Sequence, residues 1–455
     1  MSTENGPAVD ARPRGHRIVP GPRGLPFLGN MPQFGKNPLA FFERLRAHGD
    51  LVQWRFGPHP CVFVADPELI GELLTETERT FDQPALGVAF RTVMGNGVVV
   101  ARGTEWRRKR SLVQPSVRPK QVRSYAATMA GSTVELADTW SGGERIDVKR
   151  EMAALTQKIA VRTIFGVDTP ADADAMGRAM DVAQAEIGKE FAGIGALLPD
   201  WMPTPGRARI KKAAAVIDAE VARVVARHRD GGDERPDLLS RLLTAVDETG
   251  TRLDDREIRD ETVTLYIGGH ETTSSTLVWA WYLLSRNPGA RAALAEELDR
   301  VLGDREPGFD DYAHLTYAQA VVKETLRLYP TIWLVTGVAK EGARIGGLPI
   351  PEGTRVWSSQ WATQRDERWF PEPEEFRPER WDAETGDEIA EYAWFPFGGG
   401  PRVCLGTRFA MVEAVLILAV LARRFELDVD PGTVGPVPTL TLQPDREVMA
   451  TVRAR

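Results

Sequence analysis

Cys404 stands in a glycine-rich stretch that could hold a metal ion through its sulfur. The stretch reads Phe397-Gly-Gly-Gly-Pro-Arg-Val-Cys-Leu-Gly406, and an apolar helical pattern follows over residues 407–425. A buried thiolate needs a nearby cation and donated hydrogen bonds. Glycines let N–H groups approach the sulfur, and the start of the next helix points its positive end toward it. Arg402 adds positive charge or pairs with an acidic group of a cofactor. Because a buried free cysteine is more often inert packing, these surroundings carry the prediction of a ligand.

A long helix carries a second group of candidate residues at its centre. It is predicted to begin with the capping box Asp254-x-x-Glu257 and to run to about Arg286. Its middle reads Gly268-Gly-His-Glu-Thr-Thr-Ser-Ser275, and each glycine there costs about 1 kcal/mol relative to alanine. Glycine leaves room for a ligand against the backbone, and Thr272 can bond a carbonyl one turn back.

Two other kinds of site fit this segment less well. His270-Glu271 is typical of a zinc-protease helix, but Ser274 stands where the second histidine is needed. A phosphate-binding loop needs Gly-Lys-Ser/Thr, which is absent, and Gly268-Gly269 do not complete a Gly-x-Gly-x-x-Gly pattern. Without Cys404 a structural polar patch would explain the segment, so its catalytic interpretation depends on that cysteine.

Two residue pairs have spacings that place both side chains on one helix face. Trp106 and Arg110 are four residues apart, and an indole N–H beside a guanidinium can hold a carboxylate. The basic residues 107–109 between them are expected on a solvated face. Glu324 and Arg327 are three residues apart, which alone describes a common surface ion pair.

Together these motifs resemble those of the cytochrome P450 family. The pattern Phe397-x-x-Gly400-x-Arg402-x-Cys404-x-Gly406 resembles its haem-binding loop, and residues 268–272 resemble its (Ala/Gly)-Gly-x-(Asp/Glu)-Thr segment. The other motifs stand in the family's order, and the resemblance extends from Pro20 onward. They are Trp106/Arg110, Glu324/Arg327 and Arg380 in Phe376-Arg-Pro-Glu-Arg380-Trp.

The resemblance implies the cytochrome P450 fold, mainly α with a small β portion, with haem b between the long central helix and the cysteine loop. Cys404 would be the axial thiolate, which donates electron density to iron and favours cleavage of the O–O bond. Glu271 and Thr272 would be the acid–alcohol pair that relays protons to dioxygen. The residues implied to contact the haem are Trp106, Arg110, Gly268, Gly269, Phe397, Arg402, Cys404 and Gly406.

The resemblance also concerns the scaffold. Glu324, Arg327 and Arg380 would form a buried charged network that supports the haem loop and retains the cofactor without taking part in the chemistry. Many members carry an arginine that contacts a haem propionate near the position of Gly337, where this chain has Thr-Gly-Val. Either another basic residue takes this place or that propionate is held less tightly.

The implied reaction inserts one atom of O2 into a C–H bond or a double bond of a small molecule. The candidate pocket residues are mostly apolar, which suits a lipophilic substrate. Residues 330–336 resemble bacterial natural-product oxidases, so a terpenoid or polyketide is expected, with fatty-acid hydroxylation as the alternative. The pocket residues are Phe90, Met94, Val98, Leu265, Ile332, Trp333, Val335 and Leu440.

Electrons are expected from a separate ferredoxin and its NAD(P)H-dependent reductase, because the chain ends soon after Leu442. Basic residues could receive an acidic partner, namely Arg107, Lys109, Arg402 and Arg408. One alternative is a haem-thiolate protein that binds or senses a ligand without catalysis. Another is an enzyme of the same fold that uses peroxide or carries out oxidative coupling. Neither alternative strictly needs the Glu271/Thr272 pair.

Composition sets the broad class. The chain has 455 residues, a net charge of -7 and a pI near 5.6, which argues against a nucleic-acid binder. Cys61 and Cys404 make no disulfide framework and fit a reducing cytoplasm, where we expect the protein. No signal segment or membrane span is predicted. We expect a disordered tail over residues 1–17 and one domain over residues 18–455.

The remaining periodicity predicts the elements before the central helix. Helices are expected over residues 38–48 and 67–76, with a hairpin of strands 51–56 and 61–65 between them. Residues 81–100 have little periodicity and are expected to be a loop over the substrate pocket. Residues 118–248 are expected to be mostly helical.

Overall fold

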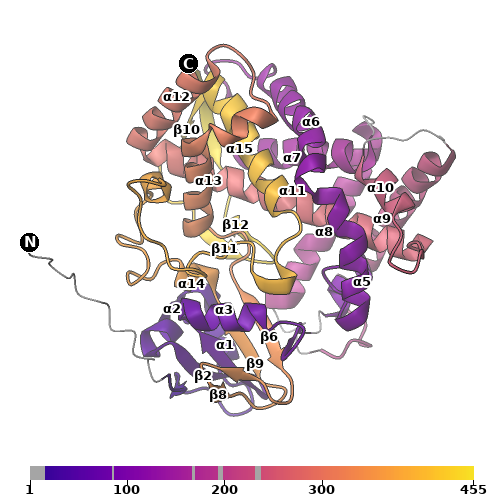
Figure 1. Ribbon diagram of the computed structural model, residues 1–455, viewed down its shortest axis with the longest axis vertical. Helices are drawn as coiled ribbons and strands as arrows, with labels where there is room; N and C mark the ends of the chain where they lie inside the picture. The colour runs from indigo at the N-terminus through magenta and orange to yellow at the C-terminus, as the bar shows by residue number, and fades with distance from the viewer. Residues whose placement is uncertain (1–15, 85–86, 167–169, 193–197, 231–236) are drawn as a thin grey trace, which may run out of the picture.

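The computed structural model describes residues 16–84, 87–166, 170–192, 198–230 and 237–455. The predicted disordered tail lies outside these ranges except for residues 16 and 17. Helices fill most of the molecule, and a sheet lies at its lower end (Figure 1). The predicted architecture, mainly α with a small β portion, is confirmed.

Most helices bury one face in a shared core, and the described helices have these bounds: α1 (Met31–Lys36), α2 (Pro38–His48), α3 (Pro67–Thr75), α4 (Val88–Met94), α5 (Gly103–Val113), α6 (Pro119–Ala137), α7 (Val148–Phe165), α8 (Pro170–Ala192), α9 (Pro205–Asp230), α10 (Leu238–Thr244), α11 (Asp255–Arg286), α12 (Pro288–Leu302), α13 (Thr316–Leu328), α14 (Gln360–Thr363) and α15 (Thr407–Arg424). Within the described ranges, no helix is both long and apolar enough to cross a bilayer.

The main sheet has six strands in the order β1-β2-β3-β9-β6-β4, and three smaller sheets accompany it. The predicted hairpin is confirmed: β2 and β3 pair antiparallel around Gly57, whose φ is +59°. The strands are β1 (Val19–Pro20), β2 (Leu51–Phe56), β3 (His59–Val64), β4 (Phe81–Asp82), β5 (Arg145–Asp147), β6 (Val335–Ala339), β7 (Arg344–Ile345), β8 (Leu348–Pro349), β9 (Arg355–Ser358), β10 (Phe425–Val429), β11 (Pro436–Pro438), β12 (Leu442–Pro444) and β13 (Met449–Ala454).

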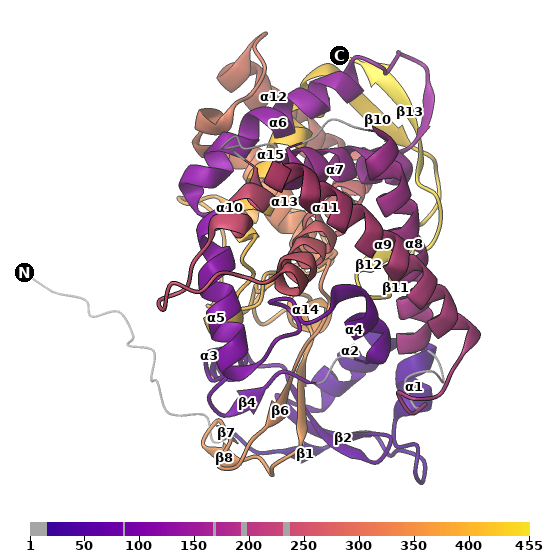
Figure 2. The ribbon, with the colours of Figure 1, turned by 90° about the vertical axis from the view of Figure 1, so that its right-hand side faces the viewer.

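Helix α11 passes through the centre of the helical part, as Figure 2 shows from the side. Its predicted capping box is confirmed: the Glu257 N–H donates to Asp254, and the Glu257 carboxylate accepts the Asp254 N–H. Trp279 is fully buried and stacks on Tyr329 with ring centroids 3.9 Å apart. Helix α15 buries all of residues 411–422 beside it. Apolar residues of α11 after position 276 and of α15 after position 410 belong to one core.

Residues 81–100 differ from the expectation of a loop. They contain β4 and the two-turn helix α4, which buries Ala89, Val93 and Met94 against α7, α8, α9 and α11. A helix this short repeats its apolar face too few times to show periodicity, which explains the error. The segment after α4 is tied to α11: the Asn96 N–H donates to Asp260 at 2.8 Å, and the Val98 N–H donates to Glu261 at 3.0 Å.

Candidate functional site

The loop before α15 holds Cys404 at the start of that helix in a fixed geometry. The Cys404 N–H donates to the Phe397 carbonyl oxygen at 2.9 Å, which closes the loop. Gly400 has a φ of +61°, and a Cβ added there would lie 2.1 Å from the Leu74 carbonyl oxygen. Any larger residue would therefore strain the backbone and clash with α3. The glycine determines how closely the cysteine loop can pack on its neighbours.

Cys404 as a residue keeps exposed surface, although protein atoms surround its thiol densely. Burial raises the pKa of the thiol, while hydrogen bonds from Gly406 and Thr407 and the charge of Arg110 lower it without outweighing burial. A metal cation reverses this balance because it stabilises the thiolate directly. The backbone donors and the nearby positive charge therefore fit a metal-bound thiolate.

Two guanidinium groups lie beside the cysteine loop, one from α5 and one from the loop itself. Arg110 donates to the Val403 carbonyl oxygen at 2.9 Å. Arg402 Nε donates to Glu78 Oε1 at 2.7 Å, an ion pair that the sequence did not predict. The buried Trp106 ring contacts both groups, with the Arg402 and Arg110 guanidinium carbons 4.5 and 5.7 Å from its centroid. Paired guanidiniums at this place fit a cofactor that carries carboxylates.

The predicted solvated face on α5 is wrong for two of its three residues. Lys109 is 1% exposed, and its ammonium donates to a backbone carbonyl oxygen before α5 at 2.5 Å. Arg108 donates to Asp247 at 2.8 Å and to Glu257 at 2.6 Å, because this side of α5 faces the segment leading into α11. Arg107 is exposed. Lys109 is therefore not accessible to an acidic protein partner.

The middle of α11 presents an open face. A Cβ added to Gly268 or Gly269 would meet no atom within 4 Å, leaving aside the helix's own adjacent backbone. Thr272 lies one turn further, and its hydroxyl donates to the Gly268 carbonyl oxygen at 2.8 Å. Gly268 is itself exposed although the helix runs through the core. The two glycines and the alcohol thus border space that a flat cofactor and a small ligand can use.

The Glu271 carboxylate accepts hydrogen bonds from two residues near the C-terminus. The Thr441 hydroxyl donates to Glu271 Oε1 at 2.8 Å, and Gln443 Nε2 approaches the same oxygen at 3.4 Å. Burial raises the pKa of Glu271, against the effect of these two donors. The neighbouring His270 is buried, which lowers its pKa, and its Nδ1 lies 2.7 Å from the Tyr266 carbonyl oxygen. Sequence reasoning missed Thr441 and Gln443 because neither stands in a motif.

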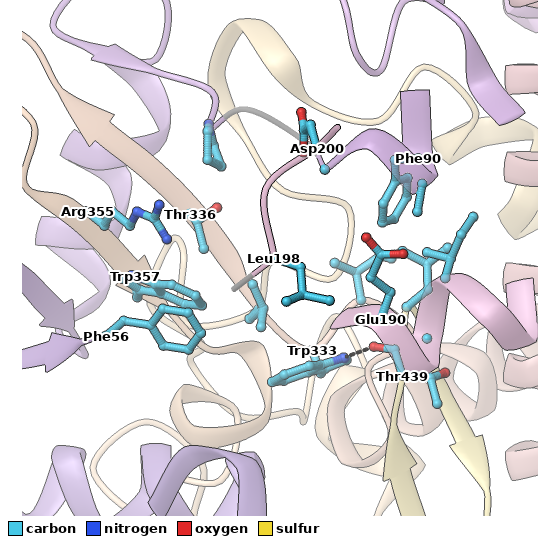
Figure 3. Close-up of a pocket in the computed structure, with 18 of the residues that line it drawn as sticks. Phe56, Phe90, Glu190, Leu198, Asp200, Trp333, Thr336, Arg355, Trp357 and Thr439 are labelled. Carbon is cyan, nitrogen blue, oxygen red and sulfur yellow. Dashed lines mark hydrogen bonds between the residues drawn. The ribbon is translucent and has the colours of Figure 1, made fainter. Parts of the chain in front are cut away.

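A cavity of about 390 Å³ lies between the sheet, α4, the segment joining α8 to α9, and the residues before β12 (Figure 3). Four of the predicted pocket residues line it, namely Phe90, Ile332, Trp333 and Leu440. Trp333 Nε1 donates to the Thr439 carbonyl oxygen at 3.0 Å, which joins the sheet side of the cavity to the C-terminal segment.

The other four predicted pocket residues lie outside the lining of this cavity. Met94 and Val98 are each 5% exposed and pack in the core, and Leu265 packs against the cluster that contains Met94. Val335 lines a second cavity beside Arg402. Its neighbour Thr336 borders both cavities, since residues 335 and 336 are adjacent on β6.

The larger cavity has charged residues at its edge. Glu190 pairs with Arg207 at 2.7 Å, and Asp200 pairs with Arg91. Arg355 has no carboxylate partner among the described residues, and it lies next to Thr336 (Figure 3). It stands on β9 opposite Val338, so its side chain lies on the face of β6 that carries Thr336 and not on the face of Gly337.

The structure brings the three predicted scaffold residues together in the core. Glu324 and Arg327 are 0% exposed and Arg380 is 1% exposed. Arg327 donates to both Glu324 oxygens at 2.9 and 2.8 Å, and Arg380 Nε donates to Glu324 Oε1 at 2.9 Å. Trp381 Nε1 donates to Glu324 Oε2 at 2.9 Å. Every oxygen of the buried carboxylate is therefore paired with donors from two separate segments.

Comparison with known proteins gives this arrangement a family. The sequence model described as Cytochrome P450 matches residues 19–450. Cyclooctatin synthase of Streptomyces melanosporofaciens is 37% identical over 433 residues, 94% of this chain and 93% of that protein. Cyclooctat-9-en-7-ol 5-monooxygenase of the same organism is 35% identical over 415 residues, 90% of each chain. Pentalenene oxygenase of Streptomyces avermitilis is 32% identical over 449 residues, 97% of this chain and 98% of that protein. The chain therefore belongs to the cytochrome P450 family of monooxygenases.

Proposed function

We propose that this cytochrome P450 binds haem b through the Cys404 thiolate and inserts one oxygen atom of O2 into a lipophilic terpenoid. The observation that carries the proposal is the setting of Cys404. Donors of Gly406 and Thr407 lower the pKa of its thiol and so favour the thiolate, and two guanidiniums lie beside its loop. When bound, haem supplies the redox chemistry that activates O2. Arg110 and Arg402 would hold its propionates, and Gly268 and Gly269 would let it lie close to α11.

Glu271 and Thr272 would supply protons to the reaction. Thr272 offers a hydroxyl on the open face of α11 that can donate and accept hydrogen bonds. Glu271 is a partly buried carboxyl whose raised pKa lets it hold a proton more readily than an exposed glutamate. An alcohol near the reacting oxygen and an exchangeable acid behind it suit a relay in which each group passes on one proton.

The proposed substrate class rests on the cavity and on the relatives. Phe90, Trp333 and Leu198 give the cavity an apolar lining, while Arg355 offers a donor to an oxygenated end of a ligand. Two relatives are named for cyclooctat-9-en-7-ol and for pentalenene, which are terpenoids. These names favour a terpenoid over a polyketide or a fatty acid for this chain.

A separate ferredoxin with its NAD(P)H-dependent reductase is the proposed electron donor. Arg107 and Arg408 are exposed on either side of the cysteine loop, on α5 and α15. Exposed positive charge at this place can attract an acidic protein. A flavin-containing reductase would be the other outcome of a reconstitution experiment.

An optical titration of the purified ferric protein tests the substrate class. Terpenoid alcohols, macrolides and fatty acids are each added while the haem spectrum is recorded. The proposal predicts a saturable shift from low to high spin with terpenoids, followed by oxygenated product when electrons are supplied. A shift with fatty acids alone would overturn the terpenoid assignment. A haem spectrum with no product from any bound compound would favour a binding or sensing protein.

A further inference from the structure

The segment before and within β12 is fixed to α11 by hydrogen bonds from side chains of α11 to a backbone carbonyl of the segment. The Leu442 carbonyl oxygen accepts two donors from α11, Ser275 Oγ at 2.7 Å and Trp279 Nε1 at 3.1 Å. The Leu442 N–H donates to the Thr331 carbonyl oxygen at 2.9 Å. Ser275 lies one turn beyond Glu271 on the same helix. The residues on either side of Leu442 are therefore held at a defined position along α11.

Those neighbouring residues form a directional chain that ends on Glu271. Gln443 Nε2 donates to Thr441 Oγ1 at 2.8 Å, and Thr441 donates its single hydroxyl proton to Glu271 Oε1 at 2.8 Å. Thr441 is only 2% exposed, so water cannot replace this donor without rearrangement. Hydrogen bonds in series polarise one another. Among the described residues, Glu271 Oε2 has no hydrogen-bond partner.

The same segment borders the substrate cavity. Thr439 and Leu440 line the cavity, and Thr439 Oγ1 donates to the Thr441 carbonyl oxygen at 2.8 Å. Three consecutive residues thus connect the cavity wall to the Glu271 carboxyl. A displaced Leu440 would move the backbone that carries the Thr441 hydroxyl.

We propose that Thr441 and Gln443 are positioning residues for the acid of the proton relay. They occupy Oε1 of Glu271 and leave Oε2 as the oxygen that exchanges protons. Each proton that Oε2 passes toward Thr272 is replaced by one from water, so the carboxyl returns to its starting state. The inference rests on the proposed role of Glu271 and adds the residues that orient it.

Other charged groups also act on Glu271 and stay constant in the test. Asp181 on α8 raises its pKa, and Lys149 on α7 lowers it. His270 on α11 is buried, and this burial lowers its pKa. The Thr441 hydroxyl is the largest of the effects that favour the charged carboxylate.

The test compares Thr441→Val, Thr441→Ser and Gln443→Leu holoenzymes with the wild type. Thr451→Val on β13 is the matched control, since it makes the same substitution in a C-terminal strand outside the site. Product formed per NAD(P)H oxidised is measured across pH. Thr441→Val should move the pH midpoint of coupling upward by about one unit, the effect of losing one hydrogen bond to a charged group. Thr441→Ser should restore the wild-type profile.

A second readout needs no turnover. The pKa of Glu271 is higher in the folded protein than in the unfolded chain, so protonation of Glu271 stabilises the folded protein. This contribution to the free energy of unfolding is complete at pH values below the unfolded pKa. It is lost as the pH rises through the folded pKa. The difference in thermal midpoint between wild type and Glu271→Gln should therefore change with pH across this window. In the Thr441→Val background the upper end of the window should lie at higher pH.

The outcomes separate this inference from the proposed function. If Glu271→Gln uncouples the enzyme but Thr441→Val and Gln443→Leu behave like Thr451→Val in both readouts, the positioning role is wrong and the relay stands. If Glu271→Gln leaves coupling unchanged, the relay itself is wrong. Should Thr441→Val fail to fold, half-buried Gln443 still decides the matter, because Gln443→Leu must shift the same profile in the same direction.

Discussion

Replacing Glu324 by glutamine should lower stability far more than the same change in a surface ion pair. Glu324 is fully buried and accepts hydrogen bonds from Arg327, Arg380 and Trp381. The substitution keeps the shape of the side chain but removes its charge, which leaves the buried Arg327 guanidinium without a carboxylate partner and Arg380 with Asp387 alone. Breaking a buried pair in this way costs about 3–5 kcal/mol.

The expected change in melting temperature follows from the length of the chain. Unfolding entropy is about 2.1 cal/mol/K per residue, which for 455 residues gives about 1 kcal/mol/K. Glu324→Gln should therefore lower the thermal midpoint by about 4 °C. Glu76→Gln is the control, because Glu76 and Arg79 form an ion pair of the same types and spacing that is exposed. Such a pair contributes at most about 1 kcal/mol, so its loss should lower the midpoint by about 1 °C or less.

Calorimetry of the haem-loaded proteins measures both midpoints, and absorbance gives the fraction of each protein that retains haem. Glu324→Gln should also retain less haem, whereas coupling in the loaded fraction should equal that of the wild type. Equal midpoints for the two variants would refute the view that this buried network stabilises the fold around the cysteine loop.

Three further predictions concern proton supply, electron supply and pH. Thr272→Val should release more peroxide and form less product per NAD(P)H, measured as the coupling ratio, whereas Thr273→Val on the adjacent position should have a smaller effect. Arg107→Glu should slow ferredoxin-supported turnover and spare peroxide-supported turnover, because Arg107 is exposed beside the cysteine loop; equal losses would count against docking there. Glu413 is fully buried and burial raises its pKa to about 8, so its stability contribution is complete near pH 4 and lost as pH rises to about 8. Glu413→Gln should not show this pH-dependent loss of stability. Thermal midpoints that fall equally in the wild type and in Glu413→Gln between about pH 4 and pH 8 would contradict the prediction.

Local signals in the sequence predicted the parts of the site that depend on one segment. The capping box at Asp254 set the start of α11, and the glycines around Cys404 set its loop. Glu324 and Arg327 meet because helical spacing places them together, and Arg380 joins them from a distant loop. That last contact was expected from the family resemblance and not from spacing.

Contacts between distant segments could not be predicted from spacing. Lys109 is buried because α5 packs against the segment at Asn96, although its neighbours in sequence are charged. Glu78 pairs with Arg402 across 324 residues, and Thr441 reaches Glu271 across 170 residues. A single polar residue in an irregular segment carries no periodic signal, so only the folded chain shows its partner.

The central claim is that Cys404 binds haem iron as a thiolate. The most direct measurement is the absorption spectrum of the reduced, carbon monoxide-treated protein, recorded for wild type and for Cys404→Ser. The wild type should give the long-wavelength band of thiolate-ligated haem, and Cys404→Ser should lose that band. The control Cys61→Ser removes the other, buried thiol and should keep the band. A wild-type spectrum without the band, or a band that survives in Cys404→Ser, would contradict the account.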